Sequence, residues 1–225
     1  MNKLFPTTGV TFLGLGQDGS VIKEWSAPDI NMKTKVVCEP CNSGWMSRME
    51  RDFAERAMTD LILGNRIGEL SKRRARGLSL FAFKTAVVAN RSLPESEWFF
   101  DSSDRYAFRK SLTIPNDVTM FLVGMEDVKG AEGFRGFNVF YPDRNHPNLS
   151  LNVCSFWVGQ LGFQVISARG LKAEKVECPP TEPGLVCRFY PTLDPQIGWP
   201  RKTVVSLNAF NEFSNRWNMI RRSQI

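Results

Sequence analysis

The chain has 225 residues, of which 42% are hydrophobic and 23% charged, the balance of a globular protein that buries a core without disulfides. This composition excludes a disordered or collagen-like chain, and no apolar run approaches the roughly 20 residues of a membrane helix. Lys and Arg outnumber Asp and Glu by 29 to 23, a net charge of +6, which favours an anionic partner such as nucleic acid.

Turn residues and hydrophobic spacing predict the elements of the first half of the chain. A hairpin is expected between about 10 and 22 because Asp18-Gly19 separates two β-rich runs. An apolar residue then recurs every three or four positions, which predicts a helix that Gly64 ends. The apolar face of that helix consists of Met46, Met49, Phe53, Ala57 and Leu61. A second helix is expected over 71–89 and a shorter one over 103–110.

The second half of the chain has the composition of β-strands. Strands are expected near 118–123, 137–141, 149–157, 161–166 and 185–187, and Ser206 is expected to cap a final helix. The predicted fold class is α+β. We expect a partial treble-clef or ββα-like zinc-knuckle unit with helices, then an antiparallel β-rich region and a C-terminal helix. The chain divides into 1–66 and 67–225, either as two units or as one continuous domain.

The cysteines and the single histidine limit which metal sites and catalytic mechanisms this chain can provide. The five cysteines are Cys38, Cys41, Cys154, Cys178 and Cys187. An odd number, without a visible secretory signal, predicts free thiols or metal ligands in a reducing compartment, and hence a cytoplasmic protein without a membrane partner. His146 is the only histidine, so a mechanism that needs two histidines from this chain is excluded.

Cys38-Glu39-Pro40-Cys41 is the informative motif. Its spacing places two thiolates on one side of a tight turn, which suits half of a tetrahedral zinc site. Three interpretations stay open: a zinc knuckle completed by other ligands, a redox pair, or two ordinary thiols at a turn. Cys154, Cys178 and Cys187 are candidate further ligands if the fold brings them close.

The stretch from Val36 through Cys38, Cys41 and Asn42 to Gly44-Trp45-Met46-Ser47 and Glu50 resembles the second half of HNH-type (His-Me finger) endonuclease-like proteins of bacteria and phages. The resemblance implies a structural zinc ion held in part by Cys38 and Cys41. It also implies that Asn42 orients a catalytic histidine, with a divalent cation such as magnesium at the leaving oxygen.

This chain lacks the first half of that finger. Neither a Glu-His pair nor an upstream Cys-x-x-Cys precedes Cys38, so either the coding sequence begins late or the chain is a degenerate relative. The predicted function is an HNH-endonuclease-like, nucleic-acid-directed protein with an incomplete catalytic set, nuclease-like but inactive as this chain alone. DNA is expected as the partner rather than RNA. The alternative is a non-enzymatic binding or inhibitor protein, with a protein partner, that reuses the scaffold.

A short basic stretch is the candidate phosphate-binding surface. It consists of Arg66, Lys72, Arg73, Arg74 and Arg76. Cations at a helix N-terminus oppose the helix dipole, so an anionic partner would explain them. A solvated basic face is the alternative interpretation.

Overall fold

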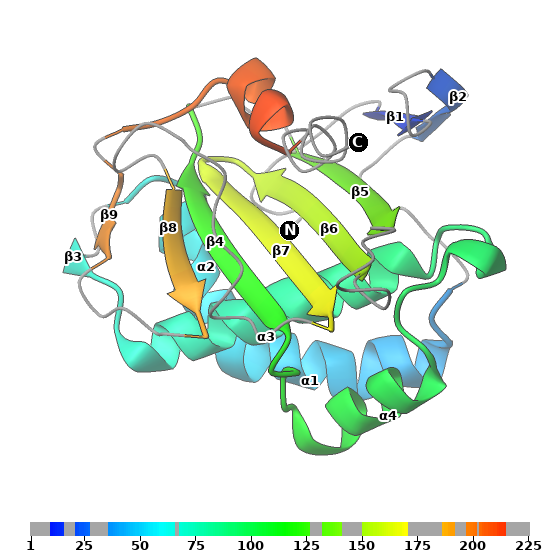
Figure 1. The fold of residues 1–225 in the computed structure, drawn as a ribbon. Helices are drawn as coiled ribbons and strands as arrows, with labels where there is room; N and C mark the ends of the chain where they lie inside the picture. Colours follow the sequence, from blue (N-terminus) through cyan, green and yellow to red (C-terminus); the bar gives the residue numbers. More distant parts are fainter. Residues whose placement is uncertain are drawn as a thin grey trace.

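The computed structural model describes residues 10–15, 21–27, 36–65, 68–126, 132–140, 150–170, 186–191, 197–201 and 203–214. Its largest feature is a five-stranded antiparallel sheet in the order β5-β6-β7-β4-β8, with the long helix α3 across one face (Figure 1). The strands are β4 (Val118–Gly124), β5 (Glu132–Phe140), β6 (Ser150–Val158), β7 (Leu161–Arg169) and β8 (Val186–Tyr190). Two small antiparallel pairs are β1 (Val10–Leu15) with β2 (Val21–Ala27), and β3 (Gly68–Glu69) with β9 (Gly198–Trp199).

Helices cover both faces of the sheet. They are η1 (Pro40–Met46), α1 (Ser47–Met49), η2 (Glu50–Ala54), α2 (Glu55–Ile62), α3 (Lys72–Asn90), the short η3 (Glu95–Glu97), α4 (Ser102–Ser111) and a final helix over 207–214. On the α3 side, one hydrophobic core runs from Met49 to Trp199 and includes the ring of Phe83. On the other side, Phe210 and Phe213 of the final helix pack near Trp157 and Val123. The predicted α+β class, with an antiparallel region before a C-terminal helix, is confirmed.

The first helical run extends from Pro40 to Ile62 and kinks at Gly44, whose ψ of −107° is not helical. Two of its parts, η1 and η2, have π-type turns. Such a turn shifts the buried face by one residue. Met49 is therefore followed in the core by Ala54, which is 1% exposed, whereas Phe53 is 40% exposed. The expectation that Phe53 belongs to the apolar face was wrong, because that expectation assumed a regular 3.6-residue period.

The end of this run is fixed by the sheet and by β9. Gly64 has a φ of 68°, a left-handed conformation that suits glycine and stops the helix as predicted. The backbone N–H of Gln160, in the β6–β7 turn, donates to the carbonyl of Ile62 at 3.1 Å. The buried Trp199 indole donates to the carbonyl of Leu61 at 3.1 Å. The Leu61 carbonyl also accepts from the backbone N–H of Gly64 at 3.2 Å, so the last carbonyls of the helix are satisfied by the turn and by the sheet together.

α3 begins and ends close to its predicted bounds. Its N-cap is Ser71, whose hydroxyl accepts from the backbone N–H of Arg74 at 3.3 Å. Half-way along, Lys84 forms an ion pair with Glu50 of η2. Near its start, Gly77 lies against the backbone of Phe53, so a methyl group there would come within 2.1 Å of the Phe53 carbonyl oxygen. At Gly77, therefore, the backbones of α3 and of the first helical run are in direct contact, with no side chain between them.

None of the helices in the described ranges combines the length and the apolar character that a membrane crossing requires.

Candidate metal and nucleic-acid site

Cys38 and Cys41 lie together in a tight turn at the start of the first helical run. The backbone N–H groups of Cys41 and Asn42 both donate to the carbonyl of Cys38 at 3.0 Å, and the helix begins at Pro40. Pro40 suits this position because it has no N–H to leave unsatisfied and its φ is already helical. Cys38 and Asn42 are exposed, and Cys41 is half-buried. The predicted turn, with a helix starting within a few residues of Asn42, is confirmed.

The two thiols interact with each other. A hydrogen bond from the Cys41 side chain is the main reason that the pKa of Cys38 lies below its ordinary value, and the Arg109 cation adds a smaller effect in the same direction. Zinc binds the thiolate form of cysteine. The pair therefore fits two adjacent ligands of a zinc ion, accessible from solvent.

The other cysteines do not complete a four-ligand site in the described part of the chain. Cys154 is buried in β6, where burial raises the pKa of its thiol, and Cys187 lies half-buried on β8. No group of three or more Cys, His, Asp or Glu side chains gathers anywhere in the described ranges. Cys154 and Cys187 were candidates only if the fold brought them close to Cys38 and Cys41, and in the described ranges both belong to the sheet and form no such group. Cys178 lies outside the described residues.

We expect alkylation to rank the thiols as the structure does. In metal-free protein, iodoacetamide should modify Cys38 with a pH midpoint below that of a free cysteine, while Cys154 stays unmodified until the protein unfolds. Because the thiolate of Cys38 accepts from Cys41, Cys41→Ala should move that midpoint upward. Peptide mass spectrometry across a pH series measures both effects. A Cys38 midpoint unchanged by Cys41→Ala would contradict the described thiol pair.

The basic stretch is divided between different surroundings. Arg74 pairs with Asp60 of α2 at 3.7 Å, which gives one first-turn cation a partner within the fold. Lys72 and Arg73 are exposed. Arg76 is also exposed, but it lies toward β8, where its charge acts on the half-buried Tyr190. Arg66 lies outside the described residues. Of the four described cations, Lys72 and Arg76 are four residues apart and share a face of α3, whereas Arg74 is paired with Asp60.

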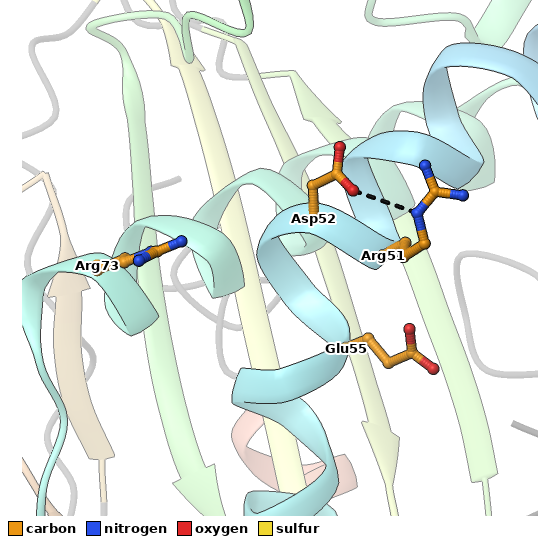
Figure 2. A pocket seen from close by; sticks show the side chains of 4 residues that line it. All are labelled: Arg51, Asp52, Glu55 and Arg73. Carbon is orange, nitrogen blue, oxygen red and sulfur yellow. Dashed lines mark hydrogen bonds and ion pairs between the residues drawn. The ribbon is translucent and has the colours of Figure 1, made fainter.

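A shallow, open hollow of about 430 Å³ lies between η2, α2 and α3, lined by Arg51, Asp52, Glu55 and Arg73. Figure 2 shows Arg73 on α3 across from the helix that carries the two carboxylates. Asp52 accepts from the Arg51 guanidinium at 3.2 Å. These carboxylates reduce the positive field around Arg73, so it is a weaker phosphate ligand than an isolated arginine.

The sequence predicted a helix over 103–110, which is α4, but not that this helix lies beside the cysteines. α4 packs through Phe108 against Trp45, with ring centroids 5.9 Å apart in an edge-to-face arrangement. The next residue, Arg109, is the cation whose charge acts on Cys38. Nothing local in the sequence indicates this approach, since the two segments are far apart along the chain. The surface around the cysteines therefore includes residues of α4.

The single histidine of the chain, His146, lies outside the described residues. The described hairpin of β1 and β2 lies away from α1 and across the sheet from it (Figure 1). Comparisons with protein-family models, curated proteins and solved structures found no match to this chain.

Proposed function

We propose that this chain is an HNH-endonuclease-like protein that binds DNA and does not cleave it alone. The observation that carries the proposal is the adjacent, solvent-accessible pair Cys38 and Cys41 at the start of a helix, followed at once by an exposed Asn42. This is the arrangement that the resemblance implies for the second half of the finger.

Cys38 and Cys41 would supply two ligands to a structural zinc ion. A closed site needs two more, and they would come from residues outside the described ranges or from a partner molecule. The role of the metal would be to fix the turn that opens the helix and so to hold Asn42 in place. Asn42 would orient a histidine as the resemblance implies.

Hydrolysis needs a general base close to the reacting water. The part of the sequence that resembles the finger, residues 1–66, contains no histidine. We therefore expect no magnesium-dependent cleavage by this chain, and we assign it binding rather than turnover.

The exposed cations of α3 are the residues that would contact the DNA phosphates. Lys72, Arg73 and Arg76 remain candidates, whereas Arg74 is engaged by Asp60. The net charge of +6 favours the same partner. Each phosphate contact on duplex DNA releases counterions and adds about −0.9 to the slope of log K against log salt concentration.

The test is duplex binding across a salt series, with metal content measured on the same preparations. We expect about one zinc per chain in the parent, lost in the Cys38→Ser/Cys41→Ser variant, and binding that weakens steeply with salt. Arg73→Gln should make the slope of log K against log salt concentration less negative by about 0.9, the value of one phosphate contact. The change should be the same on unrelated DNA sequences. Arg74→Gln is the matched control, since it removes the same charge from the neighbouring position but from an existing ion pair. It should change the slope less.

Two results would count against the proposal. If the parent binds neither duplex nor single-stranded DNA at low salt, the assigned function is wrong. If it retains no zinc after loading and dialysis, Cys38 and Cys41 are ordinary thiols and the resemblance does not extend to the metal.

A further inference from the structure

α4 carries an exposed aromatic ring between two cations. Tyr106 is 66% exposed, the highest value among the large hydrophobic side chains in the described ranges. Arg109 and Lys110 follow it by three and four residues and are exposed as well. At 3.6 residues per turn, residues with these spacings are neighbours on one helix surface, so the two cations flank the tyrosine on one side of α4.

The acidic residues of α4 do not pair with the cations of this surface. The acidic residues of α4 lie at its other end, where Arg169 forms ion pairs with Asp104 at 2.7 Å and with Asp101 at 4.0 Å. Within the described ranges, neither Arg109 nor Lys110 forms an ion pair. Cations in the last turn interact favourably with the helix dipole. The dipole does not explain why an aromatic ring lies between them.

The same surface is continuous with the cysteine turn. Trp45 packs on Phe108, and Arg109 lies near Cys38. An extended anionic chain that contacts Arg109 can therefore pass close to the exposed Asn42. In contrast, two of the basic residues of α3, Arg73 and Arg74, lie beside Asp52, Glu55 and Asp60.

We propose that the surface formed by Tyr106, Arg109 and Lys110 binds single-stranded DNA, with a base stacked on the tyrosine ring and phosphates held by the two cations. This inference rests on the proposed function and specifies the form of the nucleic acid and a second contact surface. An aromatic ring beside basic side chains is the usual means of binding a single strand without sequence preference. Arginine adds a planar, two-pronged contact to phosphate oxygens, and lysine adds a point charge.

The single strand is favoured over a duplex for a geometric reason. In a duplex, the faces of the bases are covered by the neighbouring base pairs. A tyrosine on the convex surface of α4 therefore cannot stack on a base unless the duplex is unpaired. In a single strand each base can present a free face. Phosphate contacts alone would give no preference for the single strand, and the preference must therefore depend on the ring.

The experiment measures anisotropy of a labelled oligo(dT) of about 16 nucleotides and of a duplex of the same length, both at low salt, with the full chain. Tyr106→Ala should weaken oligo(dT) binding about 10- to 100-fold and leave duplex binding within about twofold, because stacking on one base is lost. Tyr106→Phe is the matched control, since it keeps the ring, and it should bind like the parent. Arg109→Gln should weaken binding to oligo(dT), and Arg109→Lys should restore most of it, because the charge is retained.

The outcomes separate this inference from the function on which it rests. A parent that binds duplex DNA, with an oligo(dT) affinity that Tyr106→Ala leaves unchanged, overturns the α4 surface alone. Equal losses on both DNAs in Tyr106→Ala also overturn it, because the residue would then act without stacking. A parent that binds neither DNA overturns both proposals. Circular dichroism and thermal midpoints check that the variants fold, as expected for substitutions at an exposed position.

Discussion

Replacing Gly77 by alanine should lower the free energy of unfolding by about 2–3 kcal/mol. An alanine Cβ at this position would lie 2.1 Å from the carbonyl oxygen of Phe53 and 2.8 Å from its carbonyl carbon. Both are backbone atoms, so no rotamer change relieves the clash, and α3 and η2 must move apart. Alanine gains roughly 1 kcal/mol over glycine in helix propensity, which offsets only part of the loss.

Urea denaturation of Gly77→Ala and of Gly198→Ala measures this effect. A Cβ at Gly198 would meet no atom within 4 Å, so that variant should remain close to the parent in stability. The separation of the helices should also loosen the Lys84–Glu50 pair. A Gly77→Ala variant as stable as the parent would contradict the close packing of these two helices.

Much of the fold could be predicted from local patterns. The spacing of apolar residues predicted α3 within one residue at each end, and the β-rich runs predicted all five strands of the main sheet. Gly64 and Ser206 act as the helix stop and the cap that their residue types indicate. These features depend on short-range backbone preferences, which a sequence carries directly.

The departures have a different origin. Because of the π-type turn at η2, Ala54 lies in the core and Phe53 lies on the surface. The prediction assumed a regular helical period, which does not allow for such a turn. The basic stretch looked like one surface because its members are adjacent in sequence. A helix distributes adjacent residues around its axis, and in the structure Arg74 pairs with Asp60 whereas the charge of Arg76 acts on Tyr190 of β8.

In the candidate site, too, the local features could be predicted from the sequence and the tertiary contacts could not. The Cys-x-x-Cys spacing was sufficient to predict the turn and the helix start, because both are local. The position of Arg109 beside Cys38 depends on how α4 packs against η1, which involves aromatic contacts between distant segments. Residues that act together at a site are often supplied in this way, by tertiary packing instead of sequence spacing.

Those aromatic contacts lead to the second large effect, which we expect for Phe108→Ala. Phe108 is buried, with its ring edge-to-face on Phe83 at 4.9 Å and on Trp45 at 5.9 Å. Removing a buried phenylalanine side chain costs about 3–5 kcal/mol through lost burial and the cavity that remains. Aromatic pairs of this geometry add about 0.5–1.5 kcal/mol each. This should be the least stable of the single variants considered, and Phe108→Leu should lose less because it fills part of the cavity.

The same substitution tests whether α4 is positioned by its packing. If Phe108 holds α4 against Trp45, its loss should move the charge of Arg109 away from Cys38 and raise the pH midpoint of Cys38 alkylation in the folded fraction, by less than Cys41→Ala does. Tyr106→Ala, two residues away but on the exposed side, is the control and should change stability by no more than about 0.5 kcal/mol. Denaturant midpoints and the alkylation series on these variants measure both effects. If Phe108→Ala and Tyr106→Ala had equal stability, the aromatic contacts would not be what fixes α4 beside the cysteine turn.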